Sequence, residues 1–254
     1  MDVFGIKPFR PILGIITGLL AVPVSAQTGQ FDLICGYGDR EMLRAGKITR
    51  THARPEHLQI DLAAGRWCDS NCGASSTDGL HDAGADPIVL KLETGVALEG
   101  SPNQTSYTRR VTYDRATGVL TRVDESRWKE GGLSITTDIN QCEERSFSGF
   151  VWSKFRPARL RNEMRITREL NETDAGRAIM ALVPSGTTPV IVRVQVDKEG
   201  RPKHCAASAP SPMPELEAAV CTYLTGPSVT FDPALNPSGE PIDGEYRQTV
   251  TFAG

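Results

Sequence analysis

The sequence predicts an α+β protein: a small antiparallel β domain, then a C-terminal domain in which a small antiparallel sheet carries a helix on one face. Three observations predict this class. Short runs that alternate apolar and polar residues fill the N-terminal half, as in half-buried strands. A strand, a turn, a second strand, a helix and a last strand follow Pro189. Six cysteines can cross-link a small fold.

Residues 1–26 have the layout of a secretory signal peptide. Lys7 and Arg10 precede an uncharged apolar run, and Val24-Ser25-Ala26 offers the small residues that a signal peptidase reads. The run is shorter than the roughly 20 apolar residues of a membrane-spanning helix. We therefore expect cleavage after Ala26, a periplasmic protein, and no stable membrane insertion of the mature chain. The alternative is an uncleaved leader that anchors the protein in the inner membrane.

A disulfide-linked antiparallel β domain is expected at residues 27–152. Its expected strands alternate apolar and polar residues, and Gly-containing turns separate them. The chain from Tyr107 to Asp124 is predicted to form a hairpin around the sequence Asp-Arg-Ala-Thr-Gly. The expected strands are residues 57–62, 87–92, 107–113, 119–124 and 133–139.

A basic connector with a short helix at 171–182 is expected at residues 153–185. Its first part holds six Lys and Arg residues against the single acid Glu163. We interpret it as a solvated linker whose positive charges are complemented by acidic residues on the two domains. The alternative is a segment that binds an acidic partner.

Residues 186–254 form the second predicted domain. Residues 190–196 read as a strand, 197–200 as a tight turn, and 201–208 as a second strand that carries Cys205. The predicted helix at 215–224 places apolar side chains on one stripe, and Gly226 and Pro227 end it. A last strand is predicted from Glu245 to Phe252.

The even number of cysteines behind a predicted signal peptide indicates disulfides in an oxidising compartment. Six cysteines allow many pairings, and chain position favours three pairs. Cys205 and Cys221 stand alone in the C-terminal third, where packing of the predicted helix against the strand brings them together. The others are the neighbours Cys68 and Cys72, and Cys35 with Cys142, which bracket the N-terminal half.

The C-terminal residues resemble the C-terminal domain of the TonB family, the periplasmic end of a bacterial energy transducer. The resemblance covers residues 186–254 and rests on features in order: the alternating strand, the Asp-x-x-Gly turn at 197–200, Leu216-Glu217 opening the helix, Phe231-x-Pro233-Ala234 and Gly239-x-Pro241. It implies the predicted sheet and helix, and binding of a protein or peptide partner such as a segment of an outer-membrane transporter. The N-terminal half resembles uncharacterised exported proteins of α-proteobacteria through Trp67-Cys68 and Cys72.

No residue is predicted to be catalytic, and no metal or cofactor is expected. The spacing of Cys68 and Cys72 differs from redox and zinc motifs. The acids around His81 lack the spacing of a calcium loop. His52, His57 and His204 lie near no nucleophile motif.

The predicted function is a non-enzymatic exported binding or adaptor protein. A small sheet leaves its terminal strand open to an extended peptide, and the expected peptide-binding edge is Arg247, Gln248, Thr249, Val250, Thr251 and Phe252. The alternatives are a membrane-anchored TonB-type transducer and a hydrolase or enzyme inhibitor carried by the N-terminal domain. A formal net charge of −3 gives no reason to expect nucleic-acid binding. The sequence does not define the oligomeric state.

Overall fold

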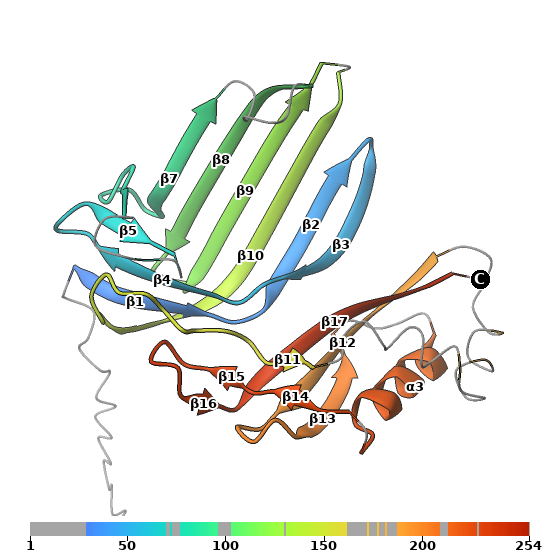
Figure 1. Cartoon of the computed structure of the whole chain (residues 1–254). Helices are drawn as coiled ribbons and strands as arrows, with labels where there is room; N and C mark the ends of the chain where they lie inside the picture. Colours follow the sequence, from blue (N-terminus) through green and yellow to red (C-terminus); the bar gives the residue numbers. More distant parts are fainter. Residues whose placement is uncertain are drawn as a thin grey trace, which may run out of the picture.

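The structure is a computed structural model of the chain (Figure 1). The expected signal peptide, and most of the expected helix at 171–182, lie outside the described residues. Within the described part, no helix is long and apolar enough to cross a membrane. The structure describes residues 29–253 apart from 70–71, 73–76, 96–102, 130, 162–171, 173–176, 178–180, 182–186, 209–212 and 228.

The predicted α+β class is wrong, because the described part of the protein is mostly β: 58% of the described residues are strand and 7% are helical. Its N-terminal part is one large, nearly closed, barrel-like antiparallel sheet rather than a small β domain. Three of the expected short strands belong to longer ones, β8, β9 and β10, whereas the strand expected at 57–62 matches β4 to within a residue. The strand expected at 133–139 continues to Ser146, and the predicted hairpin between Tyr107 and Asp124 has arms that extend beyond both ends.

Ten strands form this sheet, in the order β6-β5-β4-β1-β10-β9-β8-β7, with β2 pairing to β10 and β3 to β2 (Figure 1). Their bounds are β1 Gln30–Cys35, β2 Gly38–Arg44, β3 Lys47–Ala53, β4 Glu56–Asp61, β5 Arg66–Cys68, β6 Asp78–Gly79, β7 Ile88–Gly95, β8 Gln104–Asp114, β9 Val119–Trp128 and β10 Leu133–Ser146.

Strand β10 organises the sheet, because β1 and β2 both pair along the same side of it. The second half of β10 pairs with β1, where Cys35 lies opposite Cys142, and its first half pairs with β2. Gly38 begins β2 against the backbone of Ile139, where a β-carbon would collide with the carbonyl group. An isolated bridge between Asp82 and Val89 brings the chain that follows β6 against β7, which nearly closes the barrel.

One face of the sheet changes from apolar to charged along its strands. At one end it holds a buried core of apolar side chains from β1, β4, β5, β7, β8, β9 and β10. Two residues further along β9, side chains on the same face are charged and form ion pairs. Arg122 pairs with Glu56 at 2.6 Å and Arg109 with Asp124 at 2.7 Å. Where charged side chains replace apolar ones, the alternation of apolar and polar residues ends although the strand continues. The sequence pattern therefore predicted strands that are shorter than the real ones.

Residues 147–157 cross β1 and β4 on the face opposite the core, and we call them the strap. The chain after the strap joins the C-terminal part by backbone pairing: β11 (Arg159–Leu160) pairs with β14 (Phe231–Asp232), and Arg156 bridges Leu235. Arg161 forms an ion pair with Asp232 at 2.8 Å. The described part of the predicted linker is therefore bound to both halves.

The C-terminal part contains a three-stranded antiparallel sheet in the order β13-β12-β17, with helix α3 packed on one face (Figure 1). The core between them includes Val190, Val192, Val194, Leu216 and Val220. The expected strands and helix are present here. The bounds are β12 Thr187–Val196, β13 Pro202–Ala207, α3 Pro214–Leu224, β15 Ala234–Leu235, β16 Pro241–Ile242 and β17 Gly244–Ala253.

The six cysteines form three disulfides, the pairs that chain position favours. Cys205 on β13 bonds to Cys221 on α3, which ties the helix to its sheet. Cys35–Cys142 joins β1 to β10, and Cys68–Cys72 closes a short loop after β5. Disulfides persist in oxidising compartments, so this framework fits an extracytoplasmic protein.

Candidate functional site

The last strand, β17, has a strand partner on one side only. It pairs with β12, and no strand pairs with its other side among the described residues. It therefore lies at an edge of the C-terminal sheet, where the sequence predicted a peptide-binding strand. All six residues of that prediction, 247–252, lie within β17.

The hydrogen-bond pattern of β12 shows which backbone groups of β17 face outward. The N–H of Ser208 donates to the carbonyl of Ile191 at 2.8 Å, so Ile191 directs its backbone groups toward β13. Its neighbour Val192 therefore faces β17, where its partner is Gln248. The backbone groups of Gln248 then face β12, and those of Arg247, Thr249 and Thr251 face away from it. These outward groups form what we call the outer edge of β17.

The side chains of the strand divide between two environments. Tyr246 and Val250 are buried in the core beneath α3. Arg247 and Thr249 lie on the opposite, helix-free face, because side chains alternate along a strand. The side chains of Thr251 and Phe252 lie outside the described part of the structure.

Tyr37, between β1 and β2, contacts the side chain of Arg247 on β17. The Arg247 guanidinium lies 5.4 Å from the centre of the Tyr37 ring. Burial raises the pKa of Tyr37. Arg247, the first residue of the predicted peptide-binding edge, thus contacts the protein itself, and its guanidinium also pairs with Glu245 at 2.5 Å.

Two cavities flank this contact, and Arg247 lines both. The first, of about 300 Å³, is mostly apolar, and we call it the Phe155 cavity; its lining includes Ile34, Tyr37, Pro55, Phe155, Pro157 and Ile242. The second, of about 420 Å³, lies between the N-terminal sheet and the helix-free face of the C-terminal sheet, and we call it the His52 cavity; its lining includes Asp39, Glu41, His52, Ile139, Ile191 and Ser208.

The His52 cavity contains neutral polar groups and paired charges. Burial lowers the pKa of His52, and the nearby cations Arg247, Arg40 and Arg54 lower it further. The Nδ1 atom of His52 and the Oγ atom of Ser208 are both buried and have no hydrogen-bond partner among the described residues. Glu41 pairs with Arg50 at 3.0 Å.

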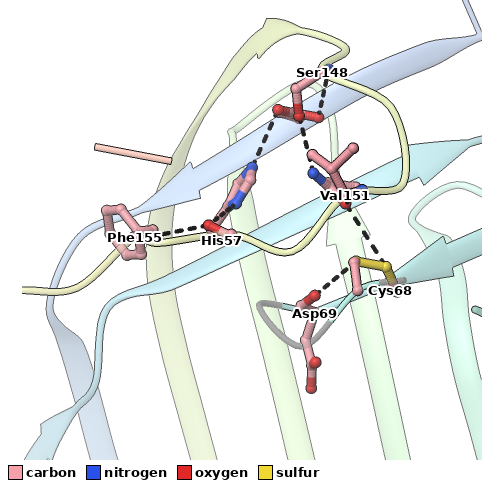
Figure 2. A network of polar contacts seen from close by, with 10 residues as sticks. His57, Cys68, Asp69, Ser148, Val151 and Phe155 are labelled. Carbon is pink, nitrogen blue, oxygen red and sulfur yellow. Dashed lines mark hydrogen bonds and ion pairs between the residues drawn. A yellow bond between two sulfur atoms is a disulfide. The ribbon is translucent and has the colours of Figure 1, made fainter. Parts of the chain in front are cut away.

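A buried polar network joins β1, β4 and the strap (Figure 2). The Nε2 atom of His57 lies 3.1 Å from Asp32 Oδ2, and its Nδ1 atom lies 2.7 Å from Ser153 Oγ. The structure thus places His57 beside a serine and an aspartate, which no sequence motif indicated. An acid, a histidine and a serine are the residue types of serine-hydrolase triads.

The geometry of the network differs from that of such a triad. In a hydrolase, Nε2 faces the serine and Nδ1 the carboxylate, whereas His57 has the opposite orientation. Ser153 is only 6% exposed, and its Oγ also accepts the Phe155 N–H at 3.1 Å. With its hydroxyl buried and engaged twice, Ser153 is suited to holding the strap in place rather than to attacking a substrate.

Gln59 continues this network along β4. Its Nε2 donates to Ser148 Oγ at 2.9 Å, and its Oε1 accepts the N–H of Val151 at 3.1 Å. The Sγ atom of Cys68 lies 3.8 Å from Gln59 Oε1, and Figure 2 shows Cys68 near Val151 of the strap. The strap is therefore bonded to the N-terminal sheet at several points before it reaches the C-terminal part.

The sequence alone did not indicate several residues of the site. The partners of His57 are 25 and 96 residues away, so no local motif identifies them. Tyr37 occurs in an ordinary Gly-Tyr-Gly turn, and its contact with Arg247 depends on how the two halves meet. The polar residues Asp32 and Gln59 within apolar strands were the one available signal, since polar residues in such positions need buried partners.

No family model, curated protein or solved structure matches the chain. The resemblance of residues 186–254 to the TonB C-terminal domain stays a prediction.

Proposed function

We propose that the protein is a non-enzymatic periplasmic binding or adaptor protein that takes up an extended peptide segment of a partner as an added strand on the outer edge of β17. One observation supports the proposal: the backbone groups of Thr249 and Thr251 point outward and no strand pairs with them within the described residues, with the Thr249 carbonyl accepting only the Gln248 side-chain amide at 3.2 Å there. Such an edge binds an extended chain through backbone hydrogen bonds.

Rigid support on both sides of the edge favours this function. The Cys205–Cys221 disulfide and the core under α3 hold β12, the neighbour of β17. The strap, fixed by His57 and Gln59, holds the N-terminal sheet beside it. A pre-organised edge loses little conformational entropy when a peptide binds. A segment of an outer-membrane transporter is one partner that the TonB resemblance implies.

The test uses random peptides of about ten residues, the length of β17, selected by display on the oxidised chain. Affinity of the selected peptide is then measured by calorimetry for the wild type, Thr249→Pro and Thr249→Ala. Proline removes an outward N–H but leaves the pairing with β12, so affinity should fall about tenfold or more. Thr249→Ala keeps that N–H and should bind like the wild type.

Equal affinity of Thr249→Pro and the wild type, or failure to select any peptide, would overturn the proposal. Sedimentation of the wild type distinguishes a different occupant. A dimer that Thr249→Pro dissociates would show that a second copy of the chain covers the edge, and this too would overturn it.

A further inference from the structure

The strap carries an apolar surface that lies outside the candidate site. Trp152 is 68% exposed and Val151 is 51% exposed. Phe147 and Phe150, also in the strap, are partly buried and pack edge to face with their ring centres 5.3 Å apart. Adjacent exposed apolar side chains, unlike scattered single ones, mark surfaces that contact another molecule.

The buried polar network holds this surface in an outward position. Ser153 points inward, since its Oγ atom lies 2.7 Å from His57 Nδ1, and the N–H of Val151 donates to Gln59 Oε1 at 3.1 Å. Trp152 and Lys154, on either side of Ser153, are both exposed. A side chain presented on a fixed backbone loses little conformational entropy on binding.

We infer that the strap is a membrane-docking segment, which inserts Val151 and Trp152 into the interface of a bilayer with anionic headgroups. This inference goes beyond the proposed function and does not depend on the outer edge of β17.

The composition of the strap is complementary to an anionic lipid surface. Between Phe147 and Pro157 the chain holds four aromatic residues, the cations Lys154 and Arg156, and no acid. Lys154 has no ion-pair partner among the described residues. Arg66 places a further cation here, with its guanidinium 5.1 Å from the centre of the Phe150 ring. Tryptophan is enriched at membrane interfaces, and anionic headgroups attract basic side chains beside it.

The shape of this surface favours a bilayer over a protein partner. Val151 and Trp152 line neither the Phe155 cavity nor the His52 cavity, and their exposure shows that they protrude. A protruding indole ring matches the interface of a bilayer, where such rings lie at the level of the headgroups.

The position of the strap relative to the expected leader agrees with this partner. The leader, with its apolar run at 12–22, precedes β1, and Phe31 of β1 pairs with Ser146, the residue before the strap. Before the expected cleavage, export therefore brings this end of the N-terminal sheet to a membrane surface.

Vesicle binding tests the docking. The purified oxidised chain is mixed with vesicles of phosphatidylethanolamine and phosphatidylglycerol in equal parts, and the bound fraction is measured by flotation at a series of lipid concentrations. Trp152→Ser should weaken binding about tenfold, because one large apolar side chain is lost from the interface. Lys154→Gln should weaken it about fivefold, because one cation is lost.

Trp128→Ser is the matched control. Trp128 is also exposed, at 37%, but it lies at the end of β9 remote from β1 and the strap. This variant should bind vesicles like the wild type.

Tryptophan fluorescence identifies the side chain that enters the lipid. The chain has three tryptophans, and Trp152 is more exposed than Trp67 and Trp128. On vesicle binding, the emission should shift to shorter wavelength, and brominated lipid should quench it. Trp152→Phe should abolish both changes while it keeps most of the binding, because phenylalanine is also apolar.

The docking would be overturned if the wild type does not bind the anionic vesicles or binds vesicles of phosphatidylcholine alone equally well. Wild-type affinity of Trp152→Ser, or a fluorescence change that persists in Trp152→Phe, would also overturn it. A dimer in solution that Trp152→Ser dissociates would show that a second copy covers the surface, which contradicts the inference. None of these results bears on strand addition, because the variants leave β17 unchanged.

Discussion

At the scale of single residues, the buried polar side chains distinguish this fold from a simple apolar barrel. His57 is 1% exposed, Asp32 3% and Gln59 1%, all on the face of β1 and β4 beneath the strap. Each has a hydrogen-bond partner in this layer. Buried polar groups stabilise the fold only while those partners remain. A buried polar group without a hydrogen-bond partner lowers the stability of the fold by the full free energy of its desolvation.

Removing the His57 ring should therefore be costly. His57→Ala leaves Asp32 and Ser153 facing a void, and we expect the free energy of unfolding to fall by about 3 kcal/mol. His81→Ala is the control, because His81 is exposed and only its backbone is hydrogen-bonded; its effect should stay within about 0.5 kcal/mol. Urea denaturation measures both, and a loss of similar size in the two variants would contradict the role of the network.

Asp197 should make stability depend on acid pH. Burial alone would raise the pKa of its carboxyl group, but the Arg201 N–H and the side chains of Lys203 and Arg201 outweigh burial and hold the pKa well below its ordinary value. The unfolded chain takes up the proton first as the pH falls. The stabilisation is thus complete above about pH 5 and declines as the pH falls through about 4 toward the folded-state pKa.

The measurement is the melting temperature of wild type and Asp197→Asn at a series of pH values. The variant should be less stable than the wild type near neutral pH, and the two should converge in acid. A constant difference at every pH would show that the carboxylate charge does not matter.

At the scale of elements, the sequence predicted the C-terminal part well and the N-terminal strands only in part. Helix α3 starts and ends within a residue of its predicted bounds, because Pro214 begins it, an apolar stripe runs along it and Gly226 follows it. Strands β2 and β3 were missed, since their charged residues, such as Arg40 and Arg50, conceal the alternation. Arg40 belongs there because it pairs with Asp138 across the sheet at 2.6 Å.

The three disulfides should differ in their contribution according to the length of chain they close. Their separations are 107, 16 and 4 residues for Cys35–Cys142, Cys205–Cys221 and Cys68–Cys72. Replacing each pair by serines should cost about 5, about 3 and about 2 kcal/mol in that order, in the chain-entropy model. Denaturation of the three double variants measures this, and a reversed order would show that local packing, rather than loop closure, determines their effect.

At the scale of the whole molecule, the candidate site depends on long-range geometry that a single sequence does not encode locally. The order of strands follows from pairings such as that of Cys35 with Cys142. The His52 cavity forms where β2 and β3 meet β12 and β17, and the Phe155 cavity forms where the end of β1 and the strap meet β16 and β17. The walls of both cavities therefore come from residues far apart in the chain. The open edge itself was predictable, because a terminal strand of a small sheet commonly lies at its margin.

The central claim is that the outer edge of β17 is open at Thr249 and receives a strand there. Amide hydrogen exchange, measured by NMR with and without the display-selected peptide, tests it most directly. In the free chain the amides of Gln248 and Val250 should be protected and that of Thr249 should exchange fast, and saturating peptide should slow Thr249. A protected Thr249 amide in the free chain, or one that still exchanges fast when peptide is bound, would contradict the claim.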